Sequence, residues 1–155
     1  MTQIEIGSKA LDFTLPATND AEITLSDFKG KNVVLYFYPK DNTPGCTQES
    51  KDFRDFVKDF EAHNTVILGI SRDRLVTHKN FKKKHEFPFE LLSDEDEMVC
   101  NLYGVMKEKN MFGKKVHGIE RSTFIIDAKG NFAKIWRKVK VPGHVEEVLE
   151  SIKTL

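Results

Sequence analysis

The sequence predicts an α/β fold in which a mixed β-sheet carries helices on both faces. Two continuous apolar runs, 33–38 and 65–70, are rich in β-branched and aromatic residues and predict buried strands. Segments 53–60 and 145–152 place apolar residues at the i, i+3, i+4 and i+7 positions of a helix. Because strands alternate with helices and a hairpin follows near the C-terminus, both parallel and antiparallel pairs are expected.

Turn and capping signals assign the elements around these segments. Two short strands at 12–15 and 22–25, separated by turn-forming residues, predict an N-terminal β-hairpin. The helix that follows the first apolar run is expected to extend from Thr43 to about Ala62. A second helix, with a thin apolar face and a basic end, is expected at 72–85.

The C-terminal half continues the alternation. A short strand at 89–92 precedes Ser93, which with the acidic residues after it predicts the N-cap and first turn of a helix. Residues 105–120 have no clear period and are expected to form a loop. A β-hairpin is expected at 123–137. His144, near the start of the last helix, is expected to be a surface or cap residue.

Length and composition set the broad class. The 155 residues are expected to form one domain, residues 1–155, burying roughly 70% of the surface of the unfolded chain. Equal numbers of basic and acidic residues, 24 each, provide no global field for nucleic acid or an anionic membrane. No signal peptide or membrane-spanning run is expected. Two distant cysteines fit a reducing compartment, so a cytoplasmic location is expected.

The stretch 38–47 carries the strongest chemical signal. Thr43 suits the N-cap of the following helix and Pro44 suits its first position, which places Cys46 in the first turn. Backbone N–H groups and the helix dipole favour the thiolate there, and the thiolate is the nucleophilic form of cysteine. A buried structural cysteine is the alternative. The position after a strand and a Pro-rich turn favours the reactive interpretation.

The same residues resemble a known family. Pro39, Thr43 and Cys46 fit the Pro-x-x-x-Thr-x-x-Cys motif of the peroxiredoxins. The wider string 36–47 resembles the peroxiredoxin Q (bacterioferritin comigratory protein) group, and the likeness runs nearly end to end, from Gly7 to His144. The resemblance implies a thioredoxin-like fold and a monomer. It also implies a cysteine thiolate that attacks a peroxide and becomes a sulfenic acid.

Further site residues follow from this resemblance. Arg121, just before a predicted strand, matches the family's active-site arginine by its context, and its guanidinium could contact thiolate and peroxide. The N–H groups of Gly45 and Cys46 and the Thr43 hydroxyl are candidate donors to the peroxide oxygens. Glu49 is expected to orient Arg121 or to cap the helix, an exposed first-turn position being the alternative.

The chain departs from its group at the resolving cysteine. Many members carry that cysteine five residues after the first, where this chain has Lys51. Cys100 is the only other thiol and is a candidate resolving residue, with an external thiol such as thioredoxin as the favoured alternative. Pro39 is expected to be structural, shielding the sulfur and shaping the turn. Thr43 stands where thioredoxin-like reductases carry the first cysteine of Cys-x-x-Cys, which disfavours disulfide reduction.

No cofactor is expected. The five histidines lack metal-ligand spacing, and no Gly-rich phosphate loop is present. The main hypothesis is a thiol-dependent peroxidase that acts in antioxidant defence, reduces hydrogen peroxide and organic hydroperoxides, and is recycled by thioredoxin or another thiol. Two alternatives are a peroxide sensor or relay, passing oxidation from Cys46 to a partner, and an inactive binding module. Retention of Pro39, Thr43, Cys46 and Arg121 together argues against the binding module.

Overall fold

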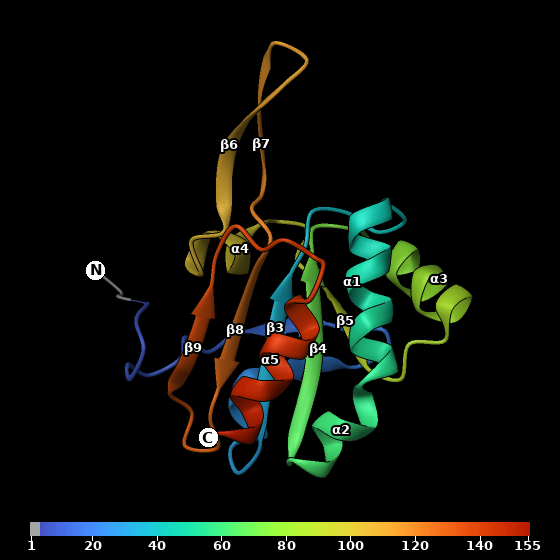
Figure 1. Ribbon diagram of the computed structural model, residues 1–155. Coiled ribbons are helices and arrows are strands. Elements are labelled where there is room, and N and C mark those ends of the chain that lie inside the picture. The colour runs from blue at the N-terminus through green and yellow to red at the C-terminus, as the bar shows by residue number, and fades with distance from the viewer. Residues whose placement is uncertain (1–3) are drawn as a thin grey trace.

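The computed structural model, which describes residues 4–155, has a five-stranded sheet at its centre (Figure 1). The strand order is β5-β4-β3-β8-β9, and β3, β4 and β5 are parallel. β8 is antiparallel to both β3 and β9, so the sheet is mixed. The strands are β3 (Asn32–Phe37), β4 (Thr65–Ser71), β5 (Glu90–Ser93), β8 (Ser122–Ile126) and β9 (Phe132–Trp136).

Helices cover both faces of this sheet, which confirms the predicted fold class. One face packs against α1 (Pro44–Asp55), α2 (Val57–Ala62), α3 (Leu75–His85) and α5 (His144–Lys153). The other packs against α4 (Met98–Leu102), the 3₁₀ turn η1 (Leu25–Phe28), and the predicted N-terminal hairpin, β1 (Thr14–Pro16) with β2 (Glu22–Thr24). Among residues 4–155, no helix is long and apolar enough to cross a bilayer.

The central strand β3 has two buried faces, which explains its continuous apolar run. Val33, Leu35 and Phe37 enter the hydrophobic cluster that also contains Cys100. Val34, Tyr36 and the following Tyr38 enter the cluster that contains Cys46. Successive side chains of a strand point to opposite faces, so the sheet separates these two clusters. Each fully buried large apolar side chain contributes roughly 1.5–3 kcal/mol to stability.

The helix expected to extend to Ala62 is interrupted. α1 ends at Asp55 and α2 begins at Val57, because Phe56 lies at φ −105°, ψ 8°. The apolar stripe runs across the break, with the rings of Phe53 and Phe60 5.9 Å apart. The spacing of apolar residues shows which side chains face the core. It does not show that a single residue within the segment departs from helical dihedral angles, so the break was not predicted.

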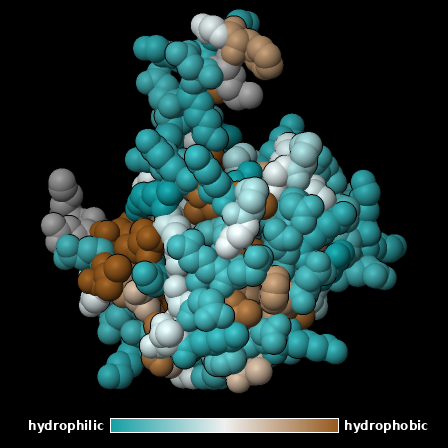
Figure 2. All heavy atoms as spheres, viewed as in Figure 1, coloured by the Kyte–Doolittle hydropathy of each residue, from teal (hydrophilic) through white to brown (hydrophobic). Residues whose placement is uncertain are grey.

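The prediction of a loop at 105–120 is wrong. These residues form an antiparallel ribbon, hereafter the arm, of β6 (Met106–Met111) and β7 (Lys114–Ile119), which projects from the body (Figure 1). Phe112 and Gly113 form its turn with φ of 52° and 78°, as a type I′ turn requires, although Asn-Gly is the usual signal. Figure 2 shows a hydrophilic arm with an apolar tip, where Phe112 is fully exposed. Because most of the arm is exposed on both faces, no apolar alternation marked it as a hairpin.

The prediction that a helix begins at Ser93 is also wrong. Ser93 is the last residue of β5, and the helix begins at Met98. Asp94 performs the capping instead, since its carboxylate accepts hydrogen bonds from the N–H groups of Val99 (3.2 Å) and Cys100 (2.7 Å). The acidic run therefore contains the cap, but the chain turns once more before the helix begins.

His144 is buried and is not the N-cap, whereas a surface or cap residue was expected from the sequence. It is the first residue of α5, its Nε2 lies 2.8 Å from the hydroxyl of Thr123, and its ring meets the edge of Trp136. Burial lowers the pKa of His144 to about 4, so the ring is neutral and forms an uncharged hydrogen bond with the Thr123 hydroxyl. The Pro142-Gly143 pair indicated only a turn before the helix. Burial of the His144 ring depends on contacts with Thr123 and Trp136, which the local sequence does not reveal.

Replacing Gly69 on β4 tests how tightly the sheet packs. A Cβ at this position would lie 2.8 Å from the Tyr36 ring and 2.9 Å from Leu91, so we expect Gly69→Ala to destabilise the protein by about 1–3 kcal/mol. Gly118→Ala is the matched control, because its added methyl meets no atom closer than 3.8 Å. Urea unfolding of both variants provides the measurement, and equal midpoints would contradict the packing argument.

Candidate active site

The sulfur of Cys46 sits where a buried strand passes into a helix. β3 ends at Phe37, a loop of residues 38–43 follows, and Cys46 is the third residue of α1, 1% exposed. Thr43 occupies the N-cap position, but its hydroxyl donates to the Lys40 carbonyl (2.7 Å) instead of accepting from a helix amide. The first helical bond runs from the N–H of Thr47 to the Thr43 carbonyl, which leaves the N–H groups of Gly45 and Cys46 ahead of it.

Arg121 joins the sulfur to a buried carboxylate. It lies between β7 and β8, and its Nη2 is 3.4 Å from the Cys46 Sγ. Its Nη1 donates to the Oε1 of Glu49 over 2.6 Å. Gly45 makes this approach possible, because a Cβ at that position would lie 3.1 Å from Nη2. The structure therefore brings together four of the residues singled out from the sequence.

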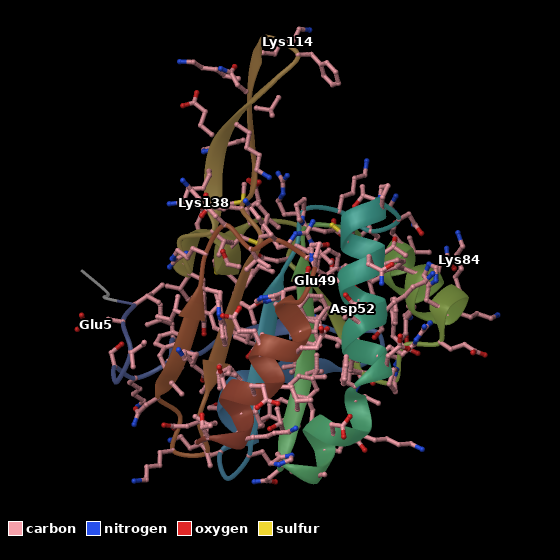
Figure 3. The ribbon with its side chains drawn as sticks, in the orientation of Figure 1. Glu5, Glu49, Asp52, Lys84, Lys114 and Lys138 are labelled. Carbon is pink, nitrogen blue, oxygen red and sulfur yellow. The ribbon has the colours of Figure 1, made fainter. Side chains whose placement is uncertain are left out.

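Glu49 lies on α1 and points toward the sheet, with its side chain fully buried (Figure 3). It is neither exposed nor a cap, and of the sequence alternatives only the contact with Arg121 is formed. Burial raises the pKa of Glu49 from 4.5 to about 7, with the charge of Arg121 acting in the opposite direction. Its second oxygen, Oε2, has no hydrogen-bond partner among residues 4–155, which also favours the protonated acid.

Lys109 is a second cation near the site that sequence reasoning missed. This β6 residue donates from Nζ to the Ile119 carbonyl over 2.5 Å at the base of the arm. Burial and the charge of Arg121 lower the pKa of Lys109, whereas Cys46 raises it, so its ammonium feels both site charges. The segment contains several lysines, and only the strand register shows which of them faces the site.

Cys100 lies apart from this group. It belongs to the hydrophobic cluster on the opposite face of the sheet, at the start of α4. Burial, with a hydrogen bond to Asp94, raises the pKa of the Cys100 thiol far above its ordinary value. The thiol therefore stays protonated at neutral pH, the less reactive form.

Hydrogen bonds to Asp41 hold the loop before α1 in place. Pro39 is half-buried in it, and Tyr38 donates its hydroxyl to Asp41 over 2.6 Å. The other oxygen of Asp41 lies 2.6 Å from Nδ1 of His78 on α3. Asp41, His78 and Asp73 place potential metal-ligand atoms within 4.8 Å of one another, an arrangement that the histidine spacing in the sequence did not indicate.

Comparison with known proteins places this site in a family. Residues 6–135 match the AhpC/TSA family. Peroxiredoxin Bcp of Bacillus subtilis is 50% identical over 98% of this chain and 97% of its own length. A cysteine-to-serine mutant of Xylella fastidiosa PrxQ superposes with a TM-score of 0.93 at 42% identity, covering 99% of this chain and 98% of that one.

A trapped-intermediate structure of the Xanthomonas campestris bacterioferritin comigratory protein, titled for its alkyl peroxide reduction activity, superposes with a TM-score of 0.90 at 44% identity. It covers 97% of this chain and 96% of that one. The fold is thus the thioredoxin-like fold of a thiol peroxidase. This chain belongs to the AhpC/TSA family of peroxiredoxin enzymes, within the peroxiredoxin Q or Bcp group.

The raised pKa of Glu49 predicts an unusual dependence of stability on pH. Between pH 4.5 and about 7 the folded protein holds a proton on Glu49 that the unfolded chain has lost, so stability falls as pH rises through this window. We expect the free energy of unfolding of the wild type, relative to Glu49→Gln, to fall by up to about 3 kcal/mol across it. Urea unfolding at stepped pH measures this difference. A difference that stays constant, or grows with pH, would contradict the assignment.

Proposed function

We propose that this peroxiredoxin reduces hydrogen peroxide and organic hydroperoxides through Cys46, which passes through a sulfenic acid. The observation that carries the proposal is the 3.4 Å contact between the Arg121 guanidinium and a cysteine sulfur in the first turn of a helix. A permanent cation and the positive end of the helix both stabilise a thiolate at this position. The buried, fixed donors also stabilise charge that develops on the peroxide.

The chemical step needs no cofactor. The Cys46 thiolate attacks the terminal oxygen of the peroxide, an S–O bond forms and the O–O bond breaks. The leaving oxygen carries the electron pair away and takes a proton, and it departs as water or an alcohol. Arg121 and the N–H groups of Gly45 and Cys46 are the donors that meet the developing negative charge.

Thr43 has a different part from the donor role expected from the sequence. Its single hydroxyl hydrogen is donated to the Lys40 carbonyl, so the oxygen offers lone pairs. It can therefore accept the O–H of a hydroperoxide and orient the substrate. Pro39, half-buried in the same loop, shapes the turn that presents Thr43.

We propose that an external thiol recycles the enzyme. Cys100 is on the opposite face of the sheet with a protonated thiol, which makes it a poor resolving residue. An external thiolate attacks the sulfenic sulfur, releases water and forms a mixed disulfide, and a second thiol then frees Cys46. Thioredoxin, in a reducing cytoplasm, is the proposed reductant of this class.

Oxidation of the two cysteine variants tests the role of Cys46. We expect stoichiometric hydrogen peroxide to add one oxygen atom to the wild type and to Cys100→Ser, with a sulfenic acid that a dimedone-type probe traps. Cys46→Ser is expected to show neither change, because the remaining thiol is buried and protonated. Intact mass spectrometry provides the measurement. Loss of two hydrogens that requires both cysteines would instead make Cys100 the resolving residue.

Removal of the Arg121 charge tests the electrostatic part of the proposal. We expect Arg121→Ala to lower the second-order rate of Cys46 oxidation by about 10²–10³-fold, the usual loss for a preorganised donor. Arg54→Lys is the control, because Arg54 lies on α1 but pairs at the surface with Asp55. Stopped-flow measurement of Cys46 oxidation by hydrogen peroxide compares the two variants, and equal oxidation rates would contradict the electrostatic role of Arg121.

Turnover with added thiols tests the sensor or relay alternative. A wild type that is oxidised rapidly once, but is reduced poorly by every thiol tested, would favour that alternative.

A further inference from the structure

Three polar side chains, two of them buried and one half-buried, form a network at the loop that leads to Cys46. Asp41 belongs to the loop 38–43, Asp73 follows β4, and His78 lies on α3. The side chains of Asp41 and His78 are both 0% exposed. No step of the proposed reaction uses these groups, although Asp41 lies in the loop that leads directly into the helix of Cys46.

The histidine ring connects three elements. Its Nε2 lies 3.0 Å from the Leu92 carbonyl, and a carbonyl only accepts, so Nε2 carries a hydrogen. Its Nδ1 lies 2.6 Å from Oδ2 of Asp41, a distance that requires one shared proton between them. The ring therefore ties α3 both to β5 and to the loop before α1.

Asp73 holds the same loop residue from a second direction. Its Oδ2 accepts the backbone N–H of Asp41 over 2.9 Å and the hydroxyl of Ser71 over 2.5 Å. Both the main chain and the side chain of Asp41 are thus fixed, and Tyr38 adds a third contact over 2.6 Å. Two residues further on is Thr43, at the N-cap of the helix that carries Cys46.

Binding of a cation is the competing interpretation of this cluster. The facing atoms already have protein partners: His78 has Asp41 and Leu92, and Asp73 Oδ2 has Ser71 and the Asp41 N–H. These contacts complete a network of hydrogen bonds, and the network restrains backbone rather than enclosing a cavity. A fully satisfied buried network specifies one conformation, since any other arrangement would leave a buried polar group unpaired.

We propose that His78 is a positioning residue for peroxide reduction, which acts through Asp41 to hold the loop 38–43 and the first turn of α1 in the reactive geometry. This inference rests on the proposed function of Cys46. Small displacements of reacting groups are costly, with roughly 10²-fold lost for a shift of about 1 Å. A loosened loop should therefore slow attack on peroxide without slowing later reactions of the oxidised sulfur.

Two substitutions of His78 separate positioning from packing. Asn keeps an amide donor near the place of Nδ1, which faces Asp41, whereas Gln keeps one near Nε2, which faces Leu92. His63→Gln is the matched control, because His63 is an exposed residue at the end of α2. For each protein, the oxidation rate with hydrogen peroxide, the rate at which dithiothreitol consumes the Cys46 sulfenic acid, and the melting temperature are measured.

We expect His78→Gln to slow oxidation by about 10-fold to 100-fold and His78→Asn to recover most of that loss. The dithiothreitol step is expected to be unchanged or faster in both, and His63→Gln to match the wild type. Tyr38→Phe, which removes one hydroxyl, is expected to slow oxidation by about threefold to fivefold and serves if the His78 variants fail to fold.

Wild-type oxidation rates in folded His78→Gln and Tyr38→Phe, even with lowered melting temperatures, would overturn the inference and leave a purely structural network. Equal losses in Asn and Gln would overturn the role of Nδ1. An oxidation rate that added zinc or manganese raises in the wild type but not in His78→Gln would overturn the inference in favour of the cation interpretation. Failure of the wild type to oxidise at Cys46 would refute the proposed function and is distinct from these outcomes.

Discussion

The guanidinium of Arg121 contacts both Glu49 and Cys46, and the rest of the site is arranged around these two contacts. Glu49 receives one N–H over 2.6 Å, and the sulfur of Cys46 lies 3.4 Å from the other terminal nitrogen. Because burial raises the pKa of Glu49 to about 7, the carboxyl holds its proton part of the time near neutrality. When it does, the full charge of Arg121 faces the sulfur. The absence of a Cβ at Gly45 and the short β7–β8 connection both serve this one approach.

The central sheet separates the two cysteines of the chain. Alternate residues of β3 pack into the cluster with Cys46 and into the cluster with Cys100. Each cysteine is the third residue of its helix, but Arg121 lies beside the sulfur of Cys46, whereas Asp94 and apolar side chains surround that of Cys100. The two cysteines therefore differ in the charge beside the sulfur, which is a cation on one face of the sheet and a carboxylate on the other.

Features set by neighbouring residues were predictable from the sequence. The Thr43-Pro44 pair predicted where α1 begins and thus the place of Cys46 in its first turn, and the apolar runs predicted the buried strands. Contacts between distant residues were not predictable in this way. The network of Asp41 and His78 joins residues 37 positions apart, and His78 reads as one polar position in a helix with a thin apolar face.

The errors have the same origin. Ser93 is a residue type that often caps helices, but its hydroxyl donates to the Asp73 carbonyl instead of bonding to a helix. A tertiary contact therefore determines its hydrogen-bond partner. The arm was missed because a ribbon that buries neither face leaves no period in its apolar residues, and because Phe112-Gly113 is an uncommon pair for its turn. The family resemblance supplied Arg121, which periodicity and capping signals alone would have left as a surface residue.

The arm makes the local stability of the protein uneven. Its two strands pair only with each other, so its backbone hydrogen bonds can open without disturbing the central sheet. Its amides should exchange with solvent through that local opening, many times faster than those of β3, which opens only with the whole domain. Because β7 ends at Ile119, two residues before Arg121, such local opening reaches the chain next to the guanidinium that contacts Cys46. The Lys109 bond to the Ile119 carbonyl lies at that junction and fastens a side chain of β6 to the last residue of β7.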